Sequence, residues 1–155
     1  LAPMAGNIFT LKLIIVSDEK KKALIAKSTG QDFIFDASYL IIVCSDSEQA
    51  ERAYEKQGKD YVKQQAGSAI QNMLLKATDL GLGSCWIGSF SKSEIKKALK
   101  IPEKIEIEAI LPIGLASKAV KAEEPKKMKT GLITFFNEWK QKPERSVKET
   151  WDELR

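Results

Sequence analysis

The sequence predicts one domain of the α/β or α+β class, with helices packed on both faces of a central sheet. Segments rich in β-branched residues alternate along the chain with segments whose apolar residues recur at helical spacing. The 155 residues are 43% hydrophobic and 30% charged. This composition supplies one buried core and is too apolar for a disordered chain.

The first two strands and the helix between them follow from composition and capping residues. Residues 11–16, LKLIIV, predict a strand. The pair Ser17–Asp18 predicts the cap of a helix over residues 19–28, and Gly30 predicts its end. Residues 39–44, YLIIVC, are uninterrupted apolar residues, which predicts a strand buried on both faces.

A long helix is predicted to begin near Glu48 or Asp60 and to end at about Leu80, before the Gly-Leu-Gly that follows. Its second half carries small and apolar residues at helical spacing: Ala66, Ala69, Ile70, Met73, Leu74, Ala77 and Leu80. Residues 85–88, CWIG, then predict a short strand.

The last third contains a short helix, a strand and a second aromatic helix. Residues 91–99 predict the short helix, which Pro102 ends. Residues 105–113 predict a strand that alternates Ile with Glu and then enters the core. Residues 116–130 are Lys-rich and irregular, and residues 132–140 predict a helix.

Composition excludes several classes of site and partner. The chain has no histidine, which excludes Ser-His-Asp triads and His-based metal sites. A net charge of +4, with lysines dispersed among glutamates, does not indicate a nucleic-acid partner. No apolar stretch approaches the ~20 residues of a membrane span, and no segment resembles a signal peptide.

The two cysteines, Cys44 and Cys85, each lie inside an apolar run. Two isolated cysteines do not form a disulfide framework or a paired zinc motif. We therefore expect two reduced core thiols and a cytoplasmic protein.

Three segments could hold a ligand. The first is a loop of small residues that ends in an asparagine: Pro3, Met4, Ala5, Gly6 and Asn7. Such a loop brings the backbone and an amide close to a ligand, although a plain turn has the same composition. The second is the end of the short strand, around Gly88–Ser89, where backbone N–H groups are free, and the third is the basic run 126–129, which suits a phosphate or is a solvated loop.

Taken in order, these segments resemble the nitroreductase family of FMN-dependent oxidoreductases. The similarity runs from Pro3 to about Trp139. Its most specific part is the block Ala69–Phe90, which contains AIQNMLL and LGLGSCWIGSF. The resemblance implies an α+β fold, with a mixed central sheet wrapped by helices, in an intimate homodimer. It implies one domain over residues 1–142, a C-terminal extension over 143–155, and a dimer core formed largely by residues 65–80.

The resemblance also implies a flavin site at the dimer interface, built from both chains. The residues that match the family's FMN contacts are Pro3, Met4, Ala5, Gly6, Asn7, Ile87, Gly88, Ser89, Lys127 and Lys129. In such enzymes NADH or NADPH gives hydride to flavin N5, and a nitroaromatic, a quinone or a flavin collects the electrons. The protein supplies orientation and N–H groups toward N5 and O4, without a catalytic side chain or a metal.

Three departures from the family pattern set the alternatives. The sequence begins after the N-terminal Arg-containing helix that grips the FMN phosphate, so that helix is missing or truncated. The residues after Asn7 are Ile-Phe-Thr where many members have x-Gln-Pro-Trp, and Gln65 stands where an acidic residue is common. The alternatives are a non-catalytic flavin-binding dimer of the same fold and a structural dimer that has lost the cofactor.

Overall fold

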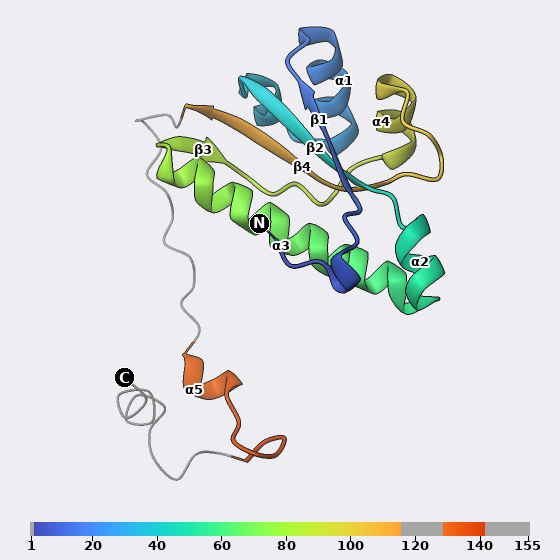
Figure 1. The fold of residues 1–155 in the computed structure, drawn as a ribbon. Coiled ribbons are helices and arrows are strands. Elements are labelled where there is room, and N and C mark those ends of the chain that lie inside the picture. Colours follow the sequence, from blue (N-terminus) through green and yellow to red (C-terminus); the bar gives the residue numbers. More distant parts are fainter. Residues whose placement is uncertain (1, 116–128, 142–155) are drawn as a thin grey trace. The chain divides into compact units, whose positions relative to one another are not determined.

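The computed structural model describes residues 2–115 and 129–141. The chain divides into two compact units, residues 1–118 and 119–155. The first unit holds a sheet with α3 along one face and α1 and α4 on the other (Figure 1). The α+β class is therefore confirmed, whereas one domain over residues 1–142 stays a prediction.

Four strands form one sheet in the order β1-β2-β4-β3. Their bounds are Leu11–Val16 for β1, Tyr39–Ser45 for β2, Leu82–Ser84 for β3 and Glu106–Leu115 for β4. All three pairings are antiparallel, so the mixed character implied by the resemblance is not seen in the described residues. The apolar run of β2 is explained by its central position, since helices cover both faces there.

The helices are α1 over Glu19–Thr29, α2 over Glu48–Tyr54, α3 over Gln57–Asp79, α4 over Lys92–Leu99 and, in the second unit, α5 over Thr130–Ile133. Two 3₁₀ turns, η1 over Ala5–Asn7 and η2 over Asp32–Asp36, complete the elements. The predicted caps of α1 are confirmed. The Asp18 carboxylate accepts a hydrogen bond from Lys21 N at 2.9 Å, and Gly30 ends the helix with φ 66°.

Two apolar clusters form the core, one on each face of the sheet. Ile25 of α1 and Ile95 of α4 pack with Ile42 and Ile107 on one face. Ala66 and Ile70 of α3 pack with Val43, Ala109 and Leu111 on the other. Because α3 lies across the sheet, loops from the two edges of the sheet meet α3 on different sides.

Of the two predicted starts of the long helix, the one near Asp60 agrees with α3, which begins at Gln57. A single helix from Glu48 is wrong, because an elbow at Glu55 and Lys56 separates α2 from α3. Glu55 has φ 51° and ψ −131°, which ends α2. Gly58, at the start of α3, then packs directly on the backbone of α2: a Cβ at Gly58 would lie 2.6 Å from Glu51 N. No proline marks the elbow, and its only glycine follows it, so a helix pattern read from the sequence runs straight through.

The strand predicted over residues 85–88 is wrong in position. The strand β3 ends at Ser84, and of the predicted residues only Ile87 pairs, through a single antiparallel bridge to Ile110. Cys85 and Trp86 lie between these two pairings and are exposed, so the prediction that Cys85 is a core thiol is also wrong. Cys44, within β2, is buried as predicted.

In the second unit, the helix predicted over residues 132–140 is wrong. The helix α5 ends at Ile133, and Asn137 and Lys140 both have left-handed backbones, which breaks any helix there. Phe135 and Trp139 pack edge to face at 4.9 Å between ring centroids. No helix in the described parts of the chain is both long and apolar enough to span a membrane.

Candidate functional site

The loop Pro3–Asn7 ends in η1, a turn with two successive left-handed residues. Gly6 has φ 56° and Asn7 has φ 58°. Glycine adopts this conformation without strain, and asparagine is among the few other residues that adopt it readily. Asn7 is exposed, and its side-chain amide makes no hydrogen bond within the described residues. The loop therefore presents an unpaired amide to solvent, as a ligand contact requires.

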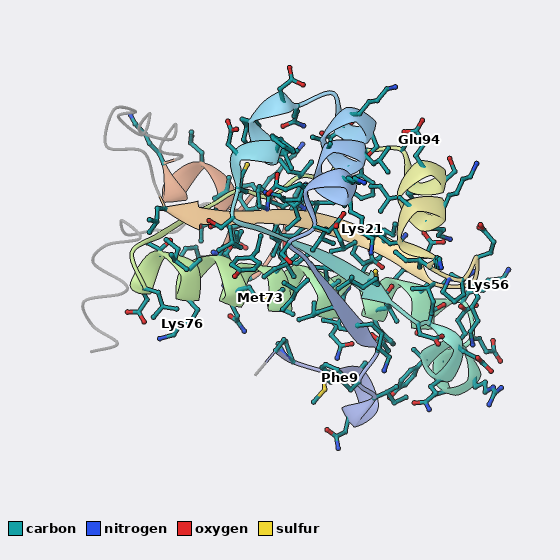
Figure 2. All side chains as sticks on the ribbon, turned by 90° about the horizontal axis from the view of Figure 1, so that it is seen from above. Phe9, Lys21, Lys56, Met73, Lys76 and Glu94 are labelled. Carbon is teal, nitrogen blue, oxygen red and sulfur yellow. The ribbon has the colours of Figure 1, made fainter. Side chains whose placement is uncertain are left out.

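Two residues that are not among the predicted contacts hold this loop. A Cβ on Gly6 would overlap the Tyr54 hydroxyl, so the turn rests closely on the end of α2. Gln65 of α3 accepts a hydrogen bond from Thr10 N at 3.2 Å and donates to Ile8 O at 3.4 Å. Phe9, labelled in Figure 2, lies between these two anchored residues and is exposed.

The second predicted segment, Ile87 to Ser89, lies along the edge of β4. Ile87 N donates to Ile110 O at 3.0 Å and Ile110 N donates to Ile87 O at 3.1 Å. This bridge fixes Ile87, which is buried, while Gly88 and Ser89 beyond it are exposed. The N–H groups of Gly88 and Ser89 donate no hydrogen bond to any described residue. Two neighbouring backbone donors are thus free to bind an acceptor.

Trp86 lies beside this segment and is 44% exposed. A Cβ on Gly67 of α3 would lie 3.9 Å from the Trp86 ring, and one on Gly88 would lie 3.8 Å from Trp86 Nε1. The indole therefore occupies the space between α3 and the free N–H groups. These contacts are those of a residue that packs between the helix and the loop.

The two predicted segments lie on opposite flanks of α3. Gln65, which contacts the loop after Asn7, and Gly67, which faces Trp86, are two residues apart in the helix. Two residues correspond to roughly 200° around a helix axis. A helix with its side chains is about 10 Å wide, so this width separates the two segments within one chain.

Of the two predicted phosphate contacts, only Lys129 is among the residues that the structure describes. Lys127 lies outside the described residues. Lys129 is exposed and precedes α5 in the second unit, where its carbonyl accepts a hydrogen bond from Leu132 N at 2.9 Å. The placement of Lys127 and Lys129 at a phosphate stays a prediction.

A wide cavity of the described residues includes none of the predicted contacts. It has a volume of about 810 Å³ and is lined mainly by charged side chains of α2, α3, α4 and β4. Many of these charges pair: Lys92 Nζ lies 2.7 Å from Glu106 Oε2, and Lys104 Nζ lies 3.0 Å from Glu48 Oε2. The hydrogen bond from Lys92 lowers the pKa of Glu106. Such mutual pairing is typical of a solvated ionic network.

Glu108 differs from Glu106, the other carboxylate of β4. Glu106 is exposed, whereas Glu108 is half-buried and accepts a hydrogen bond from Ser45 Oγ at 2.5 Å. The register of β2 and β4 shifts between Val43 and Cys44, which disturbs the simple alternation of faces. Within the described chain, no group of three or more His, Cys, Asp or Glu residues is suited to a metal ion.

The chain is similar to several known proteins. The model of the nitroreductase family matches residues 11–115, which is more than half of the chain. A protein of Archaeoglobus fulgidus named as an NADH dehydrogenase/NAD(P)H nitroreductase is 36% identical over 120 residues, which cover 74% of this chain and 66% of that protein. A nitroreductase of Methanocaldococcus jannaschii is 34% identical over 100 residues, covering 64% of this chain and 50% of that protein.

Among solved structures, the FMN-dependent nitroreductase of Clostridium difficile R20291 is similar. It is 26% identical, with a TM-score of 0.69, over 90% of this chain and 82% of that one. The matches to the two archaeal proteins, in contrast, span half to just under two thirds of those proteins.

Proposed function

Because the chain belongs to the nitroreductase family, we propose that it binds FMN and passes electrons from NADH or NADPH to a small acceptor such as a nitroaromatic, a quinone or a flavin. The observation that carries the proposal is the pair of exposed backbone donors at Gly88 and Ser89, which are free of partners in the described chain. The chemistry that FMN supplies when bound is two-electron transfer, with hydride arriving at N5.

The residues of this chain would bind and tune the flavin. The N–H groups of Gly88 and Ser89 are placed to donate to the ring edge, where reduction raises negative charge. The amide of Asn7 offers both a donor and an acceptor to the polar end of the ring. Lys127 and Lys129 would neutralise the phosphate. None of these roles needs a protein nucleophile, which agrees with a chain that has no histidine.

We also propose a homodimer with the flavin shared between chains. A ring that lies against Gly88 is separated from Asn7 of the same chain by α3, which supports a site completed by the second chain. The outer face of α3 carries an exposed leucine, Leu75, together with Gln71 and the small Ser68. Such a face suits close contact between two copies of the helix.

The absorbance spectrum of the full chain tests this proposal. We expect the purified or FMN-soaked protein to be yellow and to bleach on addition of NADH or NADPH. The variant Gly6→Ala is expected to weaken FMN binding about tenfold, because a Cβ overlaps Tyr54 and a non-glycine residue at positive φ is strained by about 1–2 kcal/mol. Gly30→Ala is the matched control, since Gly30 has φ 66° and no neighbour within 4 Å.

A chain that stays colourless after soaking with FMN, and whose melting temperature FMN does not raise, would contradict the proposal. A flavin spectrum without oxidation of NADH or NADPH, whatever the acceptor, would instead identify a non-catalytic flavin-binding dimer.

A further inference from the structure

We propose that Gln65 is a positioning residue for the cofactor site: its buried amide fixes the backbone from Ile8 to Thr10 and thereby holds Asn7 in the orientation that meets the flavin. The inference rests on the proposed function, in which the loop Pro3–Asn7 contacts FMN. Gln65 lies 57 residues from Ile8 in the chain, and it is not among the residues that match the family's FMN contacts.

The side chain of Gln65 is almost fully paired to one segment. Its Oε1 accepts hydrogen bonds from Thr10 N, at 3.2 Å, and from Thr10 Oγ1, while its Nε2 donates to Ile8 O at 3.4 Å. Gln65 is 3% exposed and Thr10 is buried as well. Hydrogen bonds that are shielded from water in this way hold a segment more firmly than exposed ones.

These bonds act on the residues directly after Asn7. The Ile8 carbonyl lies in the peptide between Ile8 and Phe9, one peptide beyond the one that follows Asn7, so fixing it restricts the path by which the chain leaves Asn7. On the other side of Asn7, Gly6 rests on the Tyr54 hydroxyl. Asn7 is therefore held from both sides while its own amide stays exposed and unpaired in the described structure.

Only an amide satisfies this contact completely. Thr10 offers two donors and Ile8 offers one acceptor, and a glutamine supplies the matching acceptor and donor. A methionine has nearly the same length and volume but supplies neither. The substitution Gln65→Met therefore removes the three bonds without opening a cavity in the side of α3.

The test is a double-mutant cycle read by FMN binding, using the quenching of FMN fluorescence on the full chain. Gln65→Met is expected to raise the FMN dissociation constant about tenfold. In the Asn7→Gly background, which removes the amide and keeps the left-handed backbone, the same substitution is expected to change it less than twofold. Gln31→Met is the matched control and is expected to leave the constant unchanged, because Gln31 follows α1 and its side chain makes no capping hydrogen bond.

Each other outcome overturns the inference. Equal effects of Gln65→Met in both backgrounds would show a general structural role that does not pass through Asn7. If the wild-type chain binds FMN and Gln65→Met leaves the FMN dissociation constant unchanged, the role of Gln65 is refuted while the proposed function stands. A wild-type chain that binds no FMN would refute the proposed function as well.

A second variant covers a failure of Gln65→Met to fold, which circular dichroism detects. Thr10→Val is isosteric and removes the hydroxyl bond to Gln65 from the loop side. It is expected to raise the dissociation constant about threefold with Asn7 present, and not at all in the Asn7→Gly background. Additive effects in this cycle would overturn the inference in the same way.

Discussion

Cys44 and Cys85 show how one residue type differs with its surroundings. Cys44 is 1% exposed in the centre of β2, and Cys85 is exposed beyond the end of β3. Burial, reinforced by the negative charge of Glu108 and opposed by Lys96, raises the pKa of the Cys44 thiol to about 11. Because the thiolate is the reactive form, Cys44 is expected to be inert at neutral pH.

The raised pKa of Cys44 predicts a loss of stability in alkali. An unfolded chain releases this proton near pH 9.0, whereas the folded chain holds it until about pH 11. The stabilisation is therefore complete below pH 9 and is lost as the pH rises toward 11. Between pH 8 and 10.5, the free energy of unfolding is expected to fall by about 2 kcal/mol less in Cys44→Ala than in wild type.

Urea unfolding at the two pH values measures this difference. Cys85→Ala, which removes an exposed thiol in place of the buried one, is the matched control. An equal fall in Cys44→Ala and wild type would mean that Cys44 does not hold its proton more tightly in the folded chain.

At the residue scale, the composition of the loop predicted its conformation but not the residues that contact and fix it. The composition of Pro3–Asn7 indicates a close approach to a ligand, and the structure shows Gly6 and Asn7 in the left-handed conformation that such a loop needs. Tyr54 and Gln65 could not be found in this way, because each meets the loop across about fifty residues of sequence. Tertiary contacts of this length leave no local pattern.

At the scale of elements, the elbow between α2 and α3 depends on one close approach. The backbone of Gly58 packs on Glu51 N and Ala50 O, where no Cβ fits. Gly67, on the same helix, has only the edge of Trp86 within 4 Å, at an ordinary contact distance of 3.9 Å. The two glycines of α3 thus differ in what a methyl group would meet.

These environments predict opposite effects of the same substitution. Gly58→Ala is expected to destabilise the chain by about 1–3 kcal/mol, since two backbones must separate. Gly67→Ala is expected to stabilise it by about 0.5–1 kcal/mol, since alanine has the higher helix propensity. Chemical denaturation of the two variants measures both, and similar values for the two would show that the elbow is not tightly packed.

The elements that the sequence predicted best are those specified by neighbouring residues. The helix α1 begins at its aspartate cap and ends at its glycine, as expected. The elbow at Glu55 and the single bridge at Ile87 were missed, because packing against other elements produces them. The helix expected over residues 132–140 failed for a related reason: helical spacing of apolar residues does not exclude left-handed turns at Asn137 and Lys140.

At the scale of the whole molecule, the outer face of α3 is the proposed contact between two chains. Leu75 lies on this face and is 59% exposed. Leu24, on α1 on the opposite side of the sheet, is a similar residue at 54% exposure. A lysine at either position costs little within one chain, because neither side chain belongs to the core.

The dimer therefore predicts different results for two matched substitutions. Leu75→Lys is expected to weaken association at least tenfold, since two positive charges would face each other across paired helices. Leu24→Lys is expected to leave it unchanged. Sedimentation velocity over a range of concentrations measures both, and a Leu75→Lys chain that associates as wild type does would place the contact elsewhere.

The overall class and the family followed from the sequence, whereas the separation of the two predicted segments by α3 did not. Alternating strand and helix patterns specify an α+β fold, and the block Ala69–Phe90 specifies the family. The division of the site by α3 depends on the angular positions of Gln65 and Gly67, which need a helix placed on a sheet.

That division has a genetic consequence. Suppose that each pocket takes its asparagine loop from one chain and its glycine–serine corner from the other. In a dimer of two differently mutated chains, the two mutations then need not fall in separate pockets. A chain with an inactivating substitution at Asn7, paired with a chain that has one at Gly88, would form one pocket with both substitutions and one pocket with neither. Two individually inactive alleles expressed in the same cell would then restore one of the two pockets in every hybrid dimer, which is about a quarter of all pockets when the chains pair at random.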